Sequence, residues 1–499
     1  MDLNAPAAAP AGNFRRWLTP SLADVFFAAL FLALFARPVG VQALLADGDT
    51  GWHIRAGELV LQAGRVPMAD PFSFSLPGHA WFAWEWGSDV LFALTYRWRG
   101  LGAVAALAGV ALALGAATVF ARVLRREAGL FPALGAALAA ASASGIHYLA
   151  RPHVFSILFY AVSLGAIEAD RRRPGWRVWT LVPLAALWAN LHAGFAMLPA
   201  TLALAAVCGP AGRRRRYALL AAASGAATLL NPYGWRLHEH IFKYLNSSWI
   251  LDHVQEFQSP SIRTEGAVVF ALLLLGAVAV AGRAGRWEAA LVLVWGFAAM
   301  RSARHVPFFA MVGAPVVASA AADWWRRYAA GAPPQSPGRI LWELSRDLGR
   351  RWSFSVWLPV SAAALVFFGA AAGAGFPDTR FPVRAVARNA AMLAPPATDM
   401  PRVLTSDQWA DYLIFRLYPR QRVFFDGRSD FYGPAVGADY RRLMAAEGGW
   451  RELLARYGFS LALLPHDWAL STVLDREPGW RLVYRDPVAV LFARDGSRP

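Results

Sequence analysis

Two carboxylates stand one residue apart near the start of the chain, Asp47 and Asp49 in the segment ADGDTGW. Such a pair can share a divalent cation or place one general base next to a membrane surface. The same pattern also occurs as an Asx-type turn, or as the N-cap of a helix, here one beginning near Trp52. Later in the same loop, the stretch WFAWEWGSD brings Glu85 back toward the pair, which favours the chemical interpretation.

Cationic and imidazole side chains recur in this loop and in the short turns that follow it. They are His53, Arg151, His153, His192, Arg236, Arg301, Arg304 and His305. Individually, such residues are often helix-end side chains that reach toward water, or hydrogen-bonded packing residues. Arginine forks, however, bind phosphate or pyrophosphate and neutralise it as a leaving group. If the turns share one side of a membrane, these residues are predicted to bind a phosphorylated substrate.

The elements that position these residues are apolar segments. Of the 499 residues, 57% are hydrophobic and only 16% are charged, a composition typical of membrane proteins. A spanning helix needs about 20 mostly apolar residues, somewhat fewer when it is packed in protein. Eleven segments qualify: 21–40, 89–121, 130–148, 153–169, 178–191, 194–209, 217–231, 266–282, 288–300, 307–322 and 354–375.

Basic clusters fall on alternate connections between these segments, which the positive-inside rule assigns to the cytoplasm. They lie at 15–16, 122–126, 171–173, 213–216, 283–286 and 326–351. The opposite, external side then receives every candidate site residue named above. Topology therefore explains the formal net charge of +16 better than a nucleic-acid partner does.

The chain is predicted to be an all-α polytopic membrane domain with about eleven transmembrane helices, followed by a C-terminal soluble α/β domain. Its parts are a cytoplasmic tail (1–20), the membrane domain (21–376) and an external domain (377–499). The membrane domain includes a large external loop (41–88) and an external interfacial segment (231–265). In the external domain, short strands are expected at 402–406, 422–428, 461–466, 481–486 and 488–494, the last two forming a hairpin.

The external domain also carries a charged cluster in the stretch DQWADYLIFRLYPRQRVFFDGRSDFYG. Its members are Asp407, Asp411, Asp426, Arg428 and Asp430. Asp426 and Gly427 after a strand indicate a turn, and the cluster is most simply an ion-pair network.

The sequence resembles bacterial members of the GT-C superfamily, multi-spanning transferases that use polyprenyl-phosphate sugars outside the cytoplasmic membrane. The resemblance lies in DGDTGWHIRAGELVLQAGRVPMADPFSFS, HAWFAWEWGSDVLF, ANLHAGF, NPYGWRLHEHIF, RHVPFFA and VFFDGRSDFYG. It implies that Asp49, or Asp47 in its place, is the general base that deprotonates the acceptor hydroxyl, with Glu85 second in the site. Arg236, Arg301, Arg304 and His305 are then the expected ligands of the lipid phosphate.

The function expected from these observations is sugar transfer from a polyprenyl-phosphate donor to a hydroxyl of a lipid, glycan or protein, at the bacterial inner membrane. A divalent cation, magnesium or manganese, on Asp47 and Asp49 is an option that the chemistry does not require, because arginines can neutralise the phosphate. Membrane lipids are expected partners. Two rival hypotheses stay open: a transporter or lipid flippase, which needs charges near helix centres, and a non-enzymatic envelope assembly protein.

Overall fold

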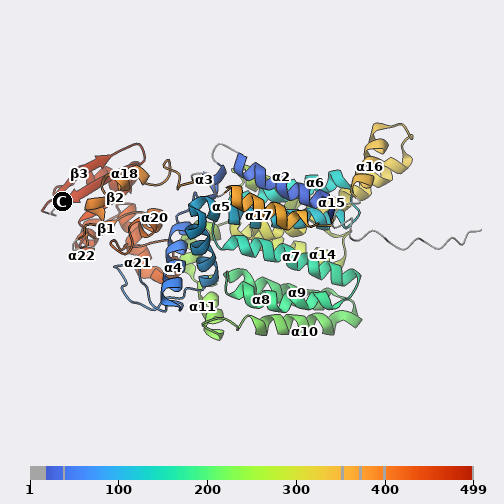
Figure 1. Ribbon diagram of the computed structural model, residues 1–499, viewed down its shortest axis with the longest axis horizontal. Coiled ribbons are helices and arrows are strands. Elements are labelled where there is room, and N and C mark those ends of the chain that lie inside the picture. The colour runs from blue at the N-terminus through green and yellow to red at the C-terminus, as the bar shows by residue number, and fades with distance from the viewer. Residues whose placement is uncertain (1–17, 37–39, 350–352, 370–373, 397–399, 497–499) are drawn as a thin grey trace, which may run out of the picture.

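The computed structural model describes residues 18–36, 40–349, 353–369, 374–396 and 400–496. A bundle of helices fills one part of the molecule, and a small α/β domain, here called the C-terminal domain (residues 374–496), lies at one end of it (Figure 1). We call this end of the bundle the domain end and the opposite one the far end.

Each of the eleven predicted membrane segments contains a helix in the structure. The helices are α2 (Leu22–Ala36), α5 (Trp86–Leu124), α6 (Leu130–Ser144), α7 (His153–Arg172), α8 (Leu181–Ala189), α9 (Met197–Cys208), α10 (Ala211–Ala227), α13 (Glu265–Ala281), α14 (Arg286–Arg301), α15 (Val306–Gly331) and α17 (Trp357–Gly369). Within the described ranges, four helices are long and apolar enough to cross a membrane: Trp86–Leu124, Leu130–His147, His153–Arg172 and Ala303–Gly331. The exact number of spans stays a prediction.

Large apolar side chains cover outward faces of the bundle. On α13, Leu272 is 65% exposed and Leu275 68%, and on α14 Leu293 is 63% exposed and Phe297 64%. Water would penalise such a surface, whereas lipid chains would cover it. The chain is therefore a helical membrane protein.

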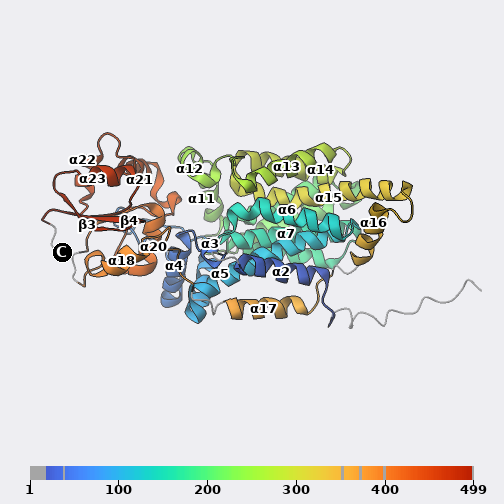
Figure 2. The ribbon, with the colours of Figure 1, turned by 90° about the horizontal axis from the view of Figure 1, so that it is seen from above.

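Short helices sit between the bundle and the C-terminal domain, and one helix caps the far end (Figures 1 and 2). At the domain end these are α3 (Gly40–Leu44) and α4 (Asp49–Ala63) from the first loop, and α11 (Trp235–Leu245) and α12 (Ser248–His253) from the 231–265 segment. At the far end, α16 (Pro337–Leu348) folds back over α15 and α6. The two predicted external loops thus lie together beside the C-terminal domain.

The C-terminal domain is built on a four-stranded sheet in the order β1-β2-β4-β3. Its elements are α18 (Val383–Arg388), α19 (Ala390–Leu393), β1 (Val403–Leu404), α20 (Asp407–Leu417), α21 (Ser429–Met444), α22 (Trp450–Tyr457), β2 (Leu461–Pro465), α23 (Ala469–Leu474), β3 (Trp480–Arg485) and β4 (Ala489–Arg494). β1 and β2 run parallel, while β4 is antiparallel to both β2 and β3. The predicted hairpin is confirmed, with Trp480 paired to Arg494 and Arg485 to Val490.

The prediction of a strand at 422–428 is wrong. This segment makes only isolated bridges, from Val423 to Val403 and to Ser73 of the first loop. Backbone hydrogen bonds of 2.9 and 3.0 Å join Val423 to Phe74 and Phe72. The segment is interrupted after Phe425, because Asp426 turns its carboxylate onto the backbone N–H of Arg428. The first loop therefore continues the edge of the sheet.

Arg428 ties the first loop to the C-terminal domain. It is only 3% exposed, it binds Asp426 through two nitrogens at 2.7 and 2.9 Å, and it approaches Asp70 of the first loop to 2.8 Å. Its guanidinium also lies over the rings of Phe72 and Trp81. Of the predicted ion-pair network, the pair between Arg428 and Asp426 is present, and it extends beyond the domain to Asp70.

We expect Arg428→Met to loosen the first loop from the C-terminal domain. The variant leaves Asp70 and Asp426 buried without their cation, a change that costs about 3–5 kcal/mol in comparable buried pairs. Thermal unfolding and limited proteolysis of the purified protein in detergent measure the effect. Arg451→Met, which breaks an ion pair of a 62% exposed side chain with Glu477, is the matched control and should change little. Equal behaviour of the two variants would contradict this account of the docking.

Candidate active site

A cavity lies at the domain end of the bundle, where the first loop, the bundle and the C-terminal domain meet. Its empty volume is about 860 Å³, part of which is open to solvent. The structure brings together on its wall seven of the residues singled out in the sequence: Asp49, His53, Glu85, Arg151, His153, His192 and Arg304.

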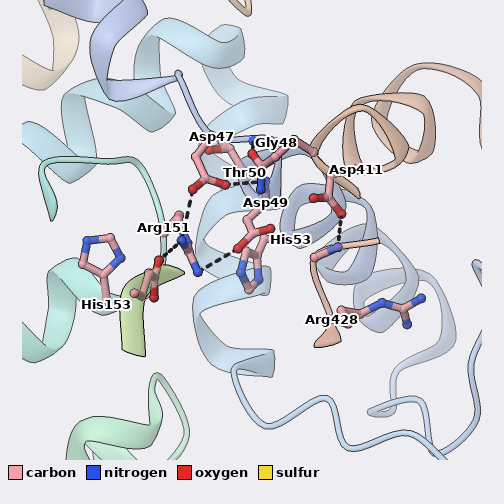
Figure 3. A network of polar contacts seen from close by, with 12 residues as sticks. Asp47, Gly48, Asp49, Thr50, His53, Arg151, His153, Asp411 and Arg428 are labelled. Carbon is pink, nitrogen blue, oxygen red and sulfur yellow. Dashed lines mark hydrogen bonds and ion pairs between the residues drawn. The ribbon is translucent and has the colours of Figure 1, made fainter. Parts of the chain in front are cut away.

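Arg151, just before α7, is the cationic centre of the cavity (Figure 3). One of its terminal nitrogens lies 3.0 Å from Asp47 and also contacts Glu256, and the other lies 2.8 Å from Asp49. Burial alone would lower the pKa of this guanidinium, but its carboxylate neighbours raise the pKa well above the ordinary value. Arg151 is therefore held in one place as a fixed positive charge.

Asp49 begins α4 and faces α20 of the C-terminal domain. Burial raises its pKa to about 7, with Arg151 opposing the rise and Asp47 adding to it. Oδ1 of Asp49 and Oδ2 of Asp411 are both buried and find no N–H donor among the described residues. Burial also raises the pKa of Asp411, which donates a hydrogen bond to Asp49. A buried carboxyl pair of this kind shares one proton.

The close approach of α4 and α20 depends on glycine. A Cβ on Gly48 would collide with the carbonyl oxygen of Gln408, and one on Gly51 would lie 2.9 Å from that of Asp411. The Gln408 side chain also accepts a hydrogen bond of 2.8 Å from the Gly48 N–H. The two glycines therefore let the C-terminal domain reach the Asp49 carboxylate.

Glu85 lies between two histidines, with its oxygens 3.8 Å from Nε2 of His53 and 3.6 Å from Nε2 of His192. Nδ1 of His192 accepts from the Gly194 N–H and contacts the Ser156 hydroxyl, so its Nε2 carries the hydrogen that faces Glu85. Nδ1 of His53 lies 2.6 Å from Asp89. Burial raises the pKa of Glu85 to about 8, which keeps it protonated at neutral pH.

Both histidines are neutral. Burial, assisted by the positive charge of Arg151, lowers the pKa of His53 well below its ordinary value. Burial also lowers the pKa of His192, and Arg304 acts in the same direction. They can therefore orient Glu85 and exchange hydrogen bonds with a substrate, but they add no positive charge to the cavity.

Arg304 is the second arginine from the bundle on the cavity wall. Its guanidinium carbon lies 4.3 Å from the centre of the Phe257 ring, and its Nη1 is buried without a hydrogen-bond partner among the described residues. Buried donors are nearly always paired in folded proteins. This nitrogen is therefore a donor that an anionic group in the cavity can use.

Several wall residues went unrecognised as functional in the sequence. Gly427, Arg428 and Asp430 of the C-terminal domain line the cavity, as do Tyr244 and Glu256 of the 231–265 segment. Asp430 contacts Nε2 of His240 at 3.0 Å, which links that domain to α11. The signal in the sequence is the charged stretch FFDGRSDF, which by itself predicts an ion-pair network.

Three of the predicted phosphate ligands do not line the cavity. Arg236, on the first turn of α11, and Arg301, on the last turn of α14, are exposed. His305 packs its ring against Trp295 instead. Helix ends point successive residues in different directions, so a shared membrane side did not guarantee a shared site. Arg304 is the one member of the expected phosphate set that lines the wall.

Asp47 serves a local role as well as an electrostatic one. Its Oδ1 accepts a hydrogen bond of 2.9 Å from the Asp49 N–H, which is the turn foreseen as the structural alternative. Across the described residues, no group of three or more His, Cys, Asp or Glu side chains is spaced to hold a metal ion. Asp47 and Asp49 each direct one oxygen at Arg151, and a divalent cation on this pair stays a prediction.

Comparisons with known proteins find similar solved structures. A crystal structure of ArnT from Cupriavidus metallidurans bound to undecaprenyl phosphate is similar over 95% of this chain and 98% of that one, with 16% sequence identity and a TM-score of 0.47. No protein-family model and no curated protein matches the sequence. The function proposed below therefore rests on the residues of the cavity.

The stability of the protein should depend on pH through Glu85. A carboxyl whose pKa rises from 4.5 to about 8 on folding stabilises the folded state fully at low pH, and this contribution is lost as pH rises through 8. The loss amounts to at most about 5 kcal/mol, at 1.36 kcal/mol per pKa unit. Glu85→Gln, which cannot ionise, should flatten the fall of the unfolding temperature between about pH 5 and pH 9.

Thermal unfolding in detergent at several pH values measures this slope. Glu452→Gln on α22 is the control, because Glu452 is exposed and lies away from the cavity. A Glu85→Gln slope equal to that of the wild type would show that Glu85 does not titrate in this range.

Proposed function

We propose that the protein is a membrane glycosyltransferase that moves a sugar from a polyprenyl-phosphate donor to an acceptor hydroxyl. One observation carries the proposal: the Asp49 carboxylate, with a pKa of about 7, lies on the same cavity wall as Arg304. Nη1 of Arg304 is buried and has no hydrogen-bond partner in the part of the chain that the structure describes. The first suits a general base, and the second suits a phosphate ligand.

In the proposed reaction, Asp49 accepts the proton of the acceptor hydroxyl as that oxygen attacks the anomeric carbon. The bond between that carbon and the phosphate oxygen breaks, and its electron pair leaves with the lipid phosphate. Attack from the face opposite the phosphate inverts the anomeric configuration. Asp411 positions the base through their shared proton, and Arg151 fixes the Asp49 carboxylate at 2.8 Å.

Arg304 is the proposed counter-charge for the departing phosphate, because the guanidinium of Arg151 is already engaged by three carboxylates. Glu85, protonated at neutral pH because its pKa is about 8, can donate a hydrogen bond to a sugar hydroxyl or a phosphate oxygen. Hydrogen-bond donors that are already in position would thus stabilise the negative charge that develops on the phosphate in the transition state, in a largely buried cavity.

A lipid carrier fits the surroundings of the cavity. Tyr244 of α11 lines the wall, and the same helix carries Trp235 and Phe242 on its outer side, 66% and 69% exposed. Amphipathic helices with such faces lie in the membrane interface. A donor whose chain stays in the bilayer could therefore present its phosphate and sugar to the cavity. We place this site on the external face of the bacterial inner membrane, with a lipid, glycan or protein as acceptor.

Asp49→Asn should abolish the modification, because the amide keeps the size of the carboxylate but cannot take a proton. Loss of a general base typically slows a reaction by about 100-fold or more. Mass spectrometry of cellular glycans and lipids compares wild type, a deletion and Asp49→Asn at matched protein abundance. The deletion identifies the missing sugar modification, and Asp49→Asn should lose the same one.

Asp252→Asn is the matched control, an aspartate on α12 in the same external region whose side chain is exposed and off the cavity wall. It should retain the modification. Full modification in Asp49→Asn cells that express normal amounts of protein would overturn the proposed base.

Arg304→Gln should weaken binding of the carrier about tenfold or more, the usual effect of losing a hydrogen bond to a charged group. Titration of the purified protein with a polyprenyl monophosphate in detergent measures the dissociation constant. Arg301→Gln removes an arginine three residues earlier that is exposed and does not line the cavity, and it should bind as the wild type does. An equal loss in both variants would assign the effect to general surface charge.

A further inference from the structure

A second, larger cavity lies at the far end of the bundle. Its empty volume is about 2310 Å³, part of it open to solvent. Two helices reach both cavities: α7 contributes Ile157 to the first and Arg172 to the second, and α15 contributes Phe308 to the first and Arg326 to the second. At 1.5 Å per helical residue, these positions are about 23–27 Å apart, most of the thickness of a bilayer core. The two cavities therefore lie near opposite surfaces of the membrane.

The walls of this second cavity are strongly basic. Among the residues that the structure describes, seven arginines line it against two acidic residues, Glu127 and Asp323. Asp323 is already paired with Arg326 at 2.8 Å, and Arg126 binds Glu168 at 2.7 Å. Arg173, Arg177 and Arg346 have no ion-pair partner within the part of the chain that the structure describes. Positive charge therefore exceeds negative charge on facing walls of one open space.

One wall is the amphipathic helix α16, which is anchored rather than loose. The Gly338 carbonyl accepts a hydrogen bond of 2.9 Å from the Trp325 indole, and the Ser345 hydroxyl accepts one of 3.1 Å from the Phe131 N–H. Trp342 lines the cavity and is 6% exposed. The helix is thereby fixed against the far end of the bundle (Figure 2).

The rim of the cavity carries apolar and aromatic side chains that face outward. On α16, Ile340, Leu344 and Leu348 are 44–50% exposed and follow each other at helical spacing. Trp176 beside Arg177 is 74% exposed, and Trp324 beside Asp323 is 64% exposed. Exposed tryptophans and an apolar helix stripe are typical of the membrane interface.

We propose that the second cavity binds the phosphate headgroup of an anionic membrane phospholipid. Arginine forks suit phosphate oxygens, and the apolar rim suits the acyl chains of the same molecule. A basic pocket between transmembrane helices is a known form of lipid-headgroup site. The exposed rim favours a lipid over free phosphate as the occupant. This site is independent of the proposed transferase cavity, and it holds whether or not that proposal does.

Binding of short-chain phosphatidylglycerol to the purified full-length protein in neutral detergent tests the proposal. The triple variant R173Q/R177Q/R346Q should bind it on the order of 100-fold more weakly, at about fivefold per arginine. Phosphatidylcholine of the same chain length and inorganic phosphate are the two comparison probes. The wild type should bind phosphatidylglycerol more tightly than either.

A second triple variant separates the cavity from general surface charge. R214Q/R215Q/R327Q removes three exposed arginines of the predicted cytoplasmic connections that do not line the cavity, and it should bind almost as the wild type does. R173K/R177K/R346K, which keeps the charge, should retain part of the binding and show that the fold is intact. Equal losses in the two glutamine variants, or equal affinity for phosphatidylcholine, would overturn the proposal. Tighter binding of inorganic phosphate than of the lipid would also overturn it and assign the arginines to a free anion.

Discussion

The candidate active site depends on one partly buried cation, Arg151, whose side chain is 22% exposed. Arg151 binds Asp47 and Asp49 from the first loop and Glu256 from the 231–265 segment, so one guanidinium joins three parts of the chain. Burying such charges is expensive, and it is tolerated only when the geometry pairs them closely. The same contacts hold the first turn of α4 against the start of α7. Every other feature of the cavity is arranged around this fixed point.

The C-terminal domain completes the environment of Asp49. Asp411 of α20 shares its proton, and Gly48 and Gly51 let α20 approach. A Cβ on Gly427 would overlap the oxygens of both carboxyl groups, so this position also requires glycine. The raised pKa of Asp49 comes mainly from burial, and part of that burial is supplied by the domain. On the proposed mechanism, docking of the domain therefore sets the strength of the base.

Hydropathy predicted the helices well, because long apolar segments have few alternatives to a helix in a membrane. The pattern of basic clusters assigned the loops that form the cavity to one side of the membrane. It thereby indicated that Asp49, Glu85, Arg151 and Arg304 lie near one another. It could not separate Arg304 from Arg301, because Ser302 breaks the helix between them with an extended backbone. Asp411 and Asp49 are 362 positions apart in the printed sequence, and no local pattern reports a contact of that kind. Likewise, the 422–428 segment has strand propensity, but its partner is a distant loop.

Arginine is used in two ways at the two ends of the bundle. In the second cavity arginines exceed acids, so the walls attract an anion directly. In the first cavity, carboxylates already neutralise the charge of Arg151. An anionic donor can therefore approach only if the other carboxyls stay neutral. With a pKa of about 8, Glu85 meets that condition at neutral pH, whereas Asp49, with a pKa of about 7, keeps an ionised fraction that can act as the base. A bound phosphate would raise the pKa of Asp49 further, because like charges disfavour ionisation. On the proposed mechanism, Asp49 takes the proton of the acceptor hydroxyl as that oxygen attacks the donor, and the proton gained by Asp49 offsets the charge of the phosphate.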